Sequence, residues 1–213
     1  MEITWFGHSL FRIVDSVGRI VVCDPFDESV GYKKPKIKAN VLLISHEHYD
    51  HNNARAIQGK PTVIRGPGLH RAAGLEFKGI PCHHDAQGGR LRGENTIFCF
   101  SMDGIRLCHL GDLGHILSQE TVREIGPVDV LFVPVGGIFT LDARGAHRVV
   151  DQLSPKIAIP MHYQTRSLSF DLEPVDRFLQ GRAVEGPEKS LCLSRENLAG
   201  EGVRTVLMDY ISA

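Results

Sequence analysis

Three histidines and one aspartate, His46, His48, Asp50 and His51, lie within six residues of the sequence. They follow directly on the uncharged apolar run 41–45, which is typical of a buried strand. Burying so many ionisable groups is costly unless something satisfies them, and a divalent cation does so because it accepts imidazole nitrogens and carboxylate oxygens together. A solvated loop is the alternative, but this spacing rarely arises by chance in a chain with 11 histidines. The segment therefore predicts a metal site.

The spacing within this segment predicts two neighbouring metal positions. In an extended chain, residues two apart face the same side, so His46 and His48 can reach one point together. Asp50 and His51 come just past the strand and can face a second point. Candidate sites in sheet proteins collect where strands end and loops begin. Other candidate ligands that follow apolar runs are Asp24, His83, His84, Asp112 and His162.

Hydrophobic patterns outline the elements that must position these groups. Apolar, often β-branched runs predict strands at 20–23, 41–44, 62–64, 77–82, 96–100, 105–110, 128–135, 156–159, 190–193 and 203–207. Capping residues and helical spacing predict helices at 118–125, 142–153 and 172–179, and a loop at 181–189. Strands dominate the first half, although His70 is expected in a helical stretch at the surface, and strands alternate with helices in the second half. This order predicts an α+β or α/β layered fold in a single domain, residues 1–213.

Several short segments together carry a family resemblance. They are 5–9 (Trp-Phe-Gly-His-Ser), 24–26, 46–51, 84–85, 92–96, 111–114 and 160–163. In this order they resemble the metallo-β-lactamase fold superfamily, and within it the small metal-dependent hydrolase branch that includes relatives of ascorbate-6-phosphate lactonases. The His-x-His-x-Asp-His motif is highly specific to that superfamily, and the other segments are weak alone. The resemblance implies a four-layer αβ/βα sandwich with the site at one edge of its two sheets.

The resemblance also implies a role for each candidate ligand. It assigns His46, His48 and His84 to a first metal, Asp50, His51 and His162 to a second, and Asp112 to both. Zinc or manganese is favoured, and iron or nickel also suits such ligands. The two ions would share a bridging hydroxide and polarise a substrate oxygen, with Asp50 and Asp112 as the catalytic carboxylates. His84 is preferred to its neighbour His83 because the family places an Asp after the ligand, and Asp85 follows His84.

Four further residues are candidates for contacts with the ligands or the substrate. Asp24 would either orient a ligand histidine or only form an Asp-Pro turn. His8 would contact substrate or hydrogen-bond locally, and Arg92 would grip an anionic group or brace its own loop. Tyr163 would donate a hydrogen bond into the cleft or pack in the core. His109, in contrast, is expected to be a core histidine turned away from Asp112.

Composition limits the classes of partner. The 24 basic and 25 acidic residues are interleaved and give a net charge of −1, so nucleic acid is not favoured as a partner. The beginning of the sequence lacks a signal-peptide pattern and no apolar run is long enough to span a membrane, which predicts a cytoplasmic protein without a membrane partner. The five cysteines lie in or beside apolar runs and are expected to be reduced. A homo-oligomer is left open.

These observations favour one function over three others. The favoured function is metal-dependent hydrolysis of a small ester-like molecule, a lactone or a phosphoester. A nuclease or phosphodiesterase is the alternative, although the chain has little room for an RNA-gripping arm. A di-iron redox site like that of flavo-di-iron proteins would have Glu where this chain has His48. A metal-binding module without catalysis would be favoured by a missing ligand, but every position of the motif set is filled.

Overall fold

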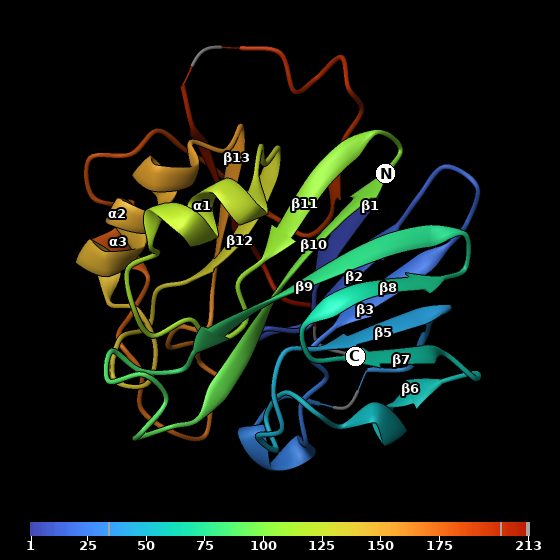
Figure 1. Ribbon diagram of the computed structural model, residues 1–213, viewed down its shortest axis with the longest axis horizontal. Coiled ribbons are helices and arrows are strands. Elements are labelled where there is room, and N and C mark those ends of the chain that lie inside the picture. Colours follow the sequence, from blue (N-terminus) through green and yellow to red (C-terminus); the bar gives the residue numbers. More distant parts are fainter. Residues whose placement is uncertain (34, 201, 212–213) are drawn as a thin grey trace.

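The computed structural model describes residues 1–33, 35–200 and 202–211, and within them two β-sheets pack face to face (Figure 1). The six-stranded sheet has the order β15 (Leu191–Cys192), β1 (Glu2–Trp5), β2 (Phe11–Val14), β3 (Ile20–Cys23), β5 (Val41–Ile44), β7 (Thr62–Arg65). The eight-stranded sheet has the order β14 (Val184–Glu188), β16 (Arg204–Met208), β13 (Ile157–Met161), β12 (Val130–Pro134), β11 (Ile105–His109), β10 (Glu94–Met102), β9 (Leu75–His83), β8 (Gly68–Ala72). A short parallel pair is formed by β4 (Ile37–Lys38) and β6 (Ile57–Gln58).

The central strand β5 is apolar because both of its faces are covered. Val41 and Leu43 point into the core between the two sheets. Leu42 and Ile44 point to the opposite face and join a second apolar cluster, which includes Phe26. A strand buried on both faces has no polar alternation, and this explains the uncharged run that precedes the histidine motif.

Helices cover the outer face of the eight-stranded sheet. Figure 1 shows α1 (Gln119–Ile125), α2 (Ala143–Leu153) and α3 (Asp176–Leu179) grouped beside β12 and β13. The outer face of the six-stranded sheet is covered instead by loops and the 3₁₀ helices η1 (Glu28–Val30) and η2 (Ala54–Ala56). The predicted layered sandwich is therefore confirmed, with one outer layer built largely from loops. None of the helices in the described ranges combines the length and the apolar character needed to cross a membrane.

Two predicted helices are confirmed, and each begins with a side-chain cap. The side chain of Ser118 accepts a hydrogen bond from the Thr121 backbone N–H at the start of α1. The carboxylate of Asp142 likewise accepts one from Gly145 at the start of α2. Satisfying these end groups is what a capping residue contributes, so the polar residue before each apolar pattern was a reliable signal.

The helix predicted at 172–179 is wrong in length, because α3 covers only Asp176–Leu179. Pro174 has no N–H and disfavours helical geometry at Glu173. The backbone N–H groups on that side are used elsewhere: Leu172 donates to the Gln164 side chain and Glu173 to the Gly136 carbonyl.

Two further local predictions are wrong. The predicted loop 181–189 contains β14, which pairs with β16 and is tied to it by two hydrogen bonds from Arg204 to Glu185, each 2.7 Å. All residues of β14 are exposed, so the sequence carries no burial pattern there. His70, expected in a helical stretch, lies instead in β8 opposite Phe77 of β9.

The C-terminal ends of strands from both sheets meet at one edge of the sandwich. Strands β3 and β5 run parallel in the six-stranded sheet, and β11, β12 and β13 run parallel in the eight-stranded sheet. Each predicted metal ligand, and Asp24 with them, follows one of these strands or β9, which has the same direction as β11. This shared edge is where ligand sites form in such sheets.

Candidate metal centre

The carboxylate of Asp112 lies at the centre of the predicted ligands. Its Oδ2 atom is 3.0 Å from Nε2 of His84, 3.1 Å from Nε2 of His162 and 3.2 Å from Nε2 of His51. Nε2 of His46 is 3.9 Å away. Asp112 follows β11, His84 and His162 follow β9 and β13, and His46 and His51 follow β5. The fold thus gathers side chains from both sheets around one buried carboxylate.

Three overlapping groups in this cluster have donor atoms close enough to share an ion. Their members are His46, His48 and His84; His46, His51 and Asp112; and His8, Asp50, His51 and His162, with all donor atoms of a group within 4.8 Å of one another. The first group equals the first predicted ligand set. The last contains the second predicted set with His8 added. Asp112 lies between them, as expected for a residue shared by two positions.

The histidine motif reaches this geometry by a different route from the one predicted. Strand β5 ends at Ile44, and the chain then bends and turns instead of continuing as an extended strand. The backbone N–H of His51 donates to the His48 carbonyl across this turn. Nδ1 of His48 nevertheless lies 3.1 Å from Nε2 of His46. The expectation that both rings reach one point is met, but the alternation argument behind it was wrong.

Hydrogen bonds at Nδ1 orient three of the rings. Nδ1 of His51 donates to Oδ2 of Asp24 at 3.0 Å. The hydroxyl of Ser45 donates to the same carboxylate at 2.6 Å, and its lone pair accepts from Nδ1 of His46 at 2.9 Å. Nδ1 of His84 donates to the Phe139 carbonyl at 3.1 Å. These partners hold a proton on Nδ1, which leaves Nε2 as the ring atom that faces Asp112 and could bind a metal ion.

The contacts of Asp24 favour the first of the two alternatives that the sequence left open, the orientation of a ligand histidine. It precedes Pro25 with a left-handed backbone (φ +45°), and its carboxylate binds Ser45 and His51. His8 and His162 also have positive φ, +52° each. Non-glycine residues seldom adopt this conformation, and they gather at functional sites where surrounding structure enforces it.

Two positioning residues were missed from the sequence. Ser45 links Asp24 to His46, as described above. Asn95 accepts a hydrogen bond from the Asp112 backbone N–H at 3.0 Å and donates to the Leu110 carbonyl at 2.8 Å, which fixes the turn that carries Asp112. Asn95 lies in one of the family-like segments, and that was its only signal.

His8 lies beneath the cluster and is fully buried. Its Nε2 donates to Oδ2 of Asp50 at 3.1 Å, and its ring centroid is 4.1 Å from that of His162. Burial and the nearby His162 lower the pKa of His8 to about 4, so its ring is neutral near pH 7. The structure thus favours a local role for His8, holding Asp50, over contact with substrate.

The other uncertain candidates are placed as follows. His83 is partly exposed and points toward Glu94 and His115, so His84 is the member of the pair that joins the cluster. Tyr163 is buried and packs on Trp5 with ring centroids 5.3 Å apart, which favours its packing role. His109 is buried and bonds to the Ser9 carbonyl and Gly111 N–H, as expected for a core histidine.

Arg92 braces a loop, although a different loop from the one predicted. Its Nη2 donates to the Ile138 carbonyl at 3.1 Å, and its guanidinium lies 5.4 Å from the centroid of the Phe139 ring. Its own backbone N–H donates to Asp85, which also accepts from Gln87, Gly89 and Leu91. The two loops that follow β9 and β12 are joined in this way.

The electrostatics of the cluster favour added positive charge. Burial alone would raise the pKa of Asp112, but His162 and His51 hold this pKa well below its ordinary value. Burial, helped by His51, lowers the pKa of His46 to about 3. Burial also opposes charge on His51, yet Asp112 and Asp50 outweigh it and raise the pKa of His51 well above its ordinary value. The ionised carboxylates thus draw positive charge to the centre.

Unpartnered donor atoms test whether a divalent ion fits here. Within the described part of the chain, Nε2 of His51, Oδ1 of Asp112 and Nδ1 of His162 are buried and lack a hydrogen-bond partner. Leaving buried polar atoms unsatisfied is costly. Nε2 of His51 and Oδ1 of Asp112 belong to the central cluster, and neutral imidazole with carboxylate is the ligand chemistry that zinc and similar ions take. The residues therefore fit a divalent metal.

A cleft of about 550 Å³ opens over this cluster. His48, Asp50, His84, Asp112 and His162 form its polar side, and the rest of its lining is Glu47, Tyr49, Leu91, Arg92, Phe139 and Phe170. The volume lies within the range of small-molecule sites. A ligand in the cleft would lie against both the metal cluster and a largely apolar wall.

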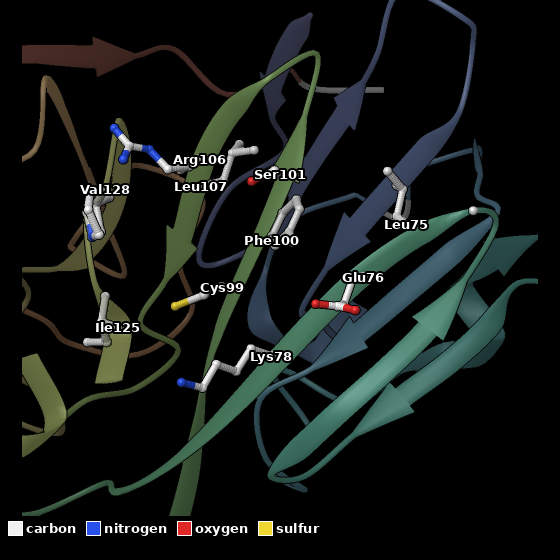
Figure 2. Close-up of a pocket in the computed structure, with 12 residues that line it drawn as sticks. Leu75, Glu76, Lys78, Cys99, Phe100, Ser101, Arg106, Leu107, Ile125 and Val128 are labelled. Carbon is white, nitrogen blue, oxygen red and sulfur yellow. The ribbon is translucent and has the colours of Figure 1, made fainter. Parts of the chain in front are cut away.

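A second groove, of about 500 Å³, is shown in Figure 2 and lies near the start of β9, whereas the cluster follows the end of that strand. Lys78 and Arg106 line it, but both have partners. Lys78 donates to the Glu124 carbonyl at 2.8 Å, and Arg106 forms two side-chain hydrogen bonds with Asp129. The described lining of this groove thus offers no comparable ligand set.

Comparisons with known proteins agree with this geometry. Residues 2–162 match the beta-lactamase superfamily domain. The chain is 31% identical over 196 residues to a UPF0173 metal-dependent hydrolase of Archaeoglobus fulgidus (78% of this chain, 84% of that protein) and 32% identical over 197 residues to one of Carboxydothermus hydrogenoformans (78% and 85%). A crystal structure from Thermotoga maritima, of a protein assigned to the zinc-dependent hydrolases of the metallo-β-lactamase superfamily, is similar with a TM-score of 0.78 and 37% identity (98% and 99% covered). The chain therefore belongs to the metallo-β-lactamase superfamily, as its motifs predicted.

Proposed function

We propose that this protein is a metal-dependent hydrolase that binds two divalent ions at the Asp112 cluster and cleaves a small ester-like substrate, a lactone or a phosphoester. The observation that carries the proposal is the convergence of three histidine Nε2 atoms within 3.2 Å of one carboxylate oxygen. The curated relatives named metal-dependent hydrolases support the reaction class. Zinc or manganese suits the ligands best.

The proposed ligand sets keep the division implied by the family resemblance. His46, His48 and His84 hold one ion, Asp50, His51 and His162 hold the other, and Asp112 contributes to both. Bound ions of this kind supply Lewis acidity and lower the pKa of water.

The chain's own residues then act on substrate and proton. Asp50 lines the cleft and is held by His8, so it is placed to orient the attacking water and to accept its proton. Asp24 and Ser45 keep His46 and His51 in the tautomers that bind metal. The largely apolar wall of the cleft would shield one side of a bound substrate from bulk water.

The remaining parts of the proposal concern the chain as a whole. The two sheets share one apolar core, which supports a single domain over residues 1–213. All five cysteines are unpaired, which supports a reducing, cytoplasmic location. The relationship to ascorbate-6-phosphate lactonases and the preference for a small molecule over nucleic acid are also parts of the proposal.

The metal content of the purified protein is the direct test. We expect about two equivalents of zinc or manganese per wild-type chain and a loss of both in a His48→Ala/Asp112→Ala double variant. The wild type should hydrolyse esters or lactones and lose this activity when a chelator removes the metal. A matched control, His70→Ala on β8, should keep the metal content unchanged.

Three outcomes would contradict the proposal. A folded wild-type protein that stays metal-free after zinc or manganese is supplied would remove the metal site and the hydrolase together. Tight iron with a visible charge-transfer band would favour redox chemistry instead. Turnover of phosphodiesters or nucleic acid but not of lactones would favour the nuclease alternative.

A further inference from the structure

The wall of the cleft away from the metal cluster is unusually apolar for an exposed surface. Tyr49, Leu91 and Phe139 line it with 55%, 62% and 38% of their surface exposed. The half-buried ring of Phe170 lies 6.1 Å from that of Phe139, edge to face. Exposed apolar side chains gathered at one place, rimmed by polar residues, mark a binding surface.

The charged residues of this wall already have partners. Glu47 accepts hydrogen bonds from Arg65 at 2.8 Å and from Asn52 at 3.1 Å. The guanidinium of Arg92 donates to the Ile138 carbonyl and lies over Phe139, so it supports the wall. Among the described lining residues there is no further lysine or arginine. Arg92 is therefore the one cation among the described lining residues, and it is already engaged with Ile138 and Phe139, so the wall offers little to bind a large anionic group.

We propose that the substrate is an uncharged carboxylic ester or lactone that carries an apolar chain or ring, and that Leu91, Phe139 and Phe170 bind this apolar part. The inference rests on the proposed hydrolase function and narrows it, since it selects lactone-type substrates over phosphoesters. Arg92 is a positioning residue for the wall, because it joins the loop that carries Leu91 to the loop that carries Phe139.

Binding of carboxylates tests the wall without any turnover. The metal-loaded protein is titrated with acetate, butyrate, hexanoate and octanoate in a calorimeter, since a carboxylate can occupy the metals while its tail reaches the wall. We expect the affinity to rise about two- to fourfold for each added methylene until the wall is filled.

Variants of the wall give the matched comparison. Leu91→Ala and Phe139→Ala should lower the ratio of octanoate to acetate affinity at least several-fold. Leu69→Ala on β8 removes a leucine with the same 62% exposure outside the cleft and should keep the wild-type ratio. A wild-type ratio near one, or a ratio that the wall variants leave unchanged, would overturn the inference.

Turnover then separates this inference from the hydrolase proposal. The substrates are γ-lactones with alkyl tails of increasing length, compared with phenyl phosphate. We expect kcat/KM to rise with tail length and phenyl phosphate to be a poor substrate. If long carboxylates bind more tightly but no lactone or ester is hydrolysed, the wall is supported and the hydrolase proposal fails. If lactones are hydrolysed regardless of tail length, or phenyl phosphate is preferred, the hydrolase proposal stands and this inference fails.

Discussion

At the scale of single residues, one carboxylate sets the orientation of two proposed metal ligands. Asp24 binds His51 directly and His46 through Ser45, although it lies more than twenty residues before either ring. The sequence alone could not reveal this orienting role, because a lone Asp-Pro pair is typical of an ordinary turn.

Replacing this carboxylate tests the arrangement. Asp24→Asn keeps the shape but gives His51 and Ser45 a neutral partner, so both rings lose their fixed tautomer. We expect metal affinity to fall roughly 10- to 100-fold, measured by competition with a coloured chelator. Asp15→Asn is the control, since Asp15 is also buried but binds Arg19 in the β2–β3 turn. Wild-type affinity in Asp24→Asn would refute the orienting role.

The sequence predicted the proposed metal ligands better than the residues that orient them. The proposed ligands follow apolar strands and have side chains that suit metal, so their residue types and their positions in the sequence both indicated a metal site. Ser45 and Asn95 bond mainly to residues distant in sequence, and nothing in their own neighbourhood indicates those partners. Tyr163 could not be assigned because packing and hydrogen bonding both suit a tyrosine.

At the scale of elements, close contacts between turns bring the strand ends together. Gly114 follows the Asp112 turn, and its N–H donates to the His83 carbonyl at 3.0 Å. A Cβ atom at Gly114 would collide with the backbone of His84. The missing side chain therefore allows the β9 and β11 ends to approach each other.

Adding that side chain should separate the two turns. We expect Gly114→Ala to lower the free energy of unfolding by about 1–3 kcal/mol, as overpacking does, and to weaken metal binding by moving His84. Urea unfolding and metal competition measure the two effects. Gly88→Ala adds a Cβ that meets nothing within 4 Å and should affect metal binding little. Unchanged metal affinity in Gly114→Ala would show that His84 tolerates the shift.

Strands with continuous buried apolar runs were predicted from the sequence, whereas β1 and β2, whose apolar residues are interrupted by polar ones, and the exposed strand β14 were not. Strands β5, β12 and β13 have fully buried apolar runs, and α2 has a cap and a regular apolar face. Strand β14 has five exposed residues, so its pairing depends on a partner that the local sequence does not reveal. The prediction made the short helix α3 too long, because the backbone N–H groups just before it donate to other loops.

At the scale of the whole molecule, stability in acid depends in part on an ion pair that joins two strands of the larger sheet. Arg106, in β11, forms two side-chain hydrogen bonds with Asp129, just before β12, and they hold the pKa of Asp129 below its ordinary value. A carboxyl whose pKa is lower in the folded state stabilises the fold above its unfolded pKa, near 4. This contribution is lost as the pH falls through the folded pKa.

Asp129→Asn should therefore lower Tm at pH 7 and matter less in acid. Because Arg106 is half exposed, we expect a loss of about 1 kcal/mol, or roughly 2–4 °C in a chain of this size. The difference from wild type should shrink as the pH falls below about 4. Thermal scans with a chelator present keep metal loss out of the comparison. Asp151→Asn, which removes one exposed charge from α2, should show no such trend, and a constant difference for Asp129→Asn would contradict the assignment.

Because the site is built from both sheets, its proposed metal ligands are synthesised at different times. The histidine motif follows β5, whereas His162 follows β13, far later in the chain. At about 5–20 residues per second, a ribosome completes His162 on the order of ten seconds after His51. During that interval the nascent chain gains His84 and then Asp112, but the set of donors still lacks His162. On the proposed assignment, metal loading is therefore a late event, completed after β13 has joined the sheet, and the exposed ring of His48 lies where ions would enter.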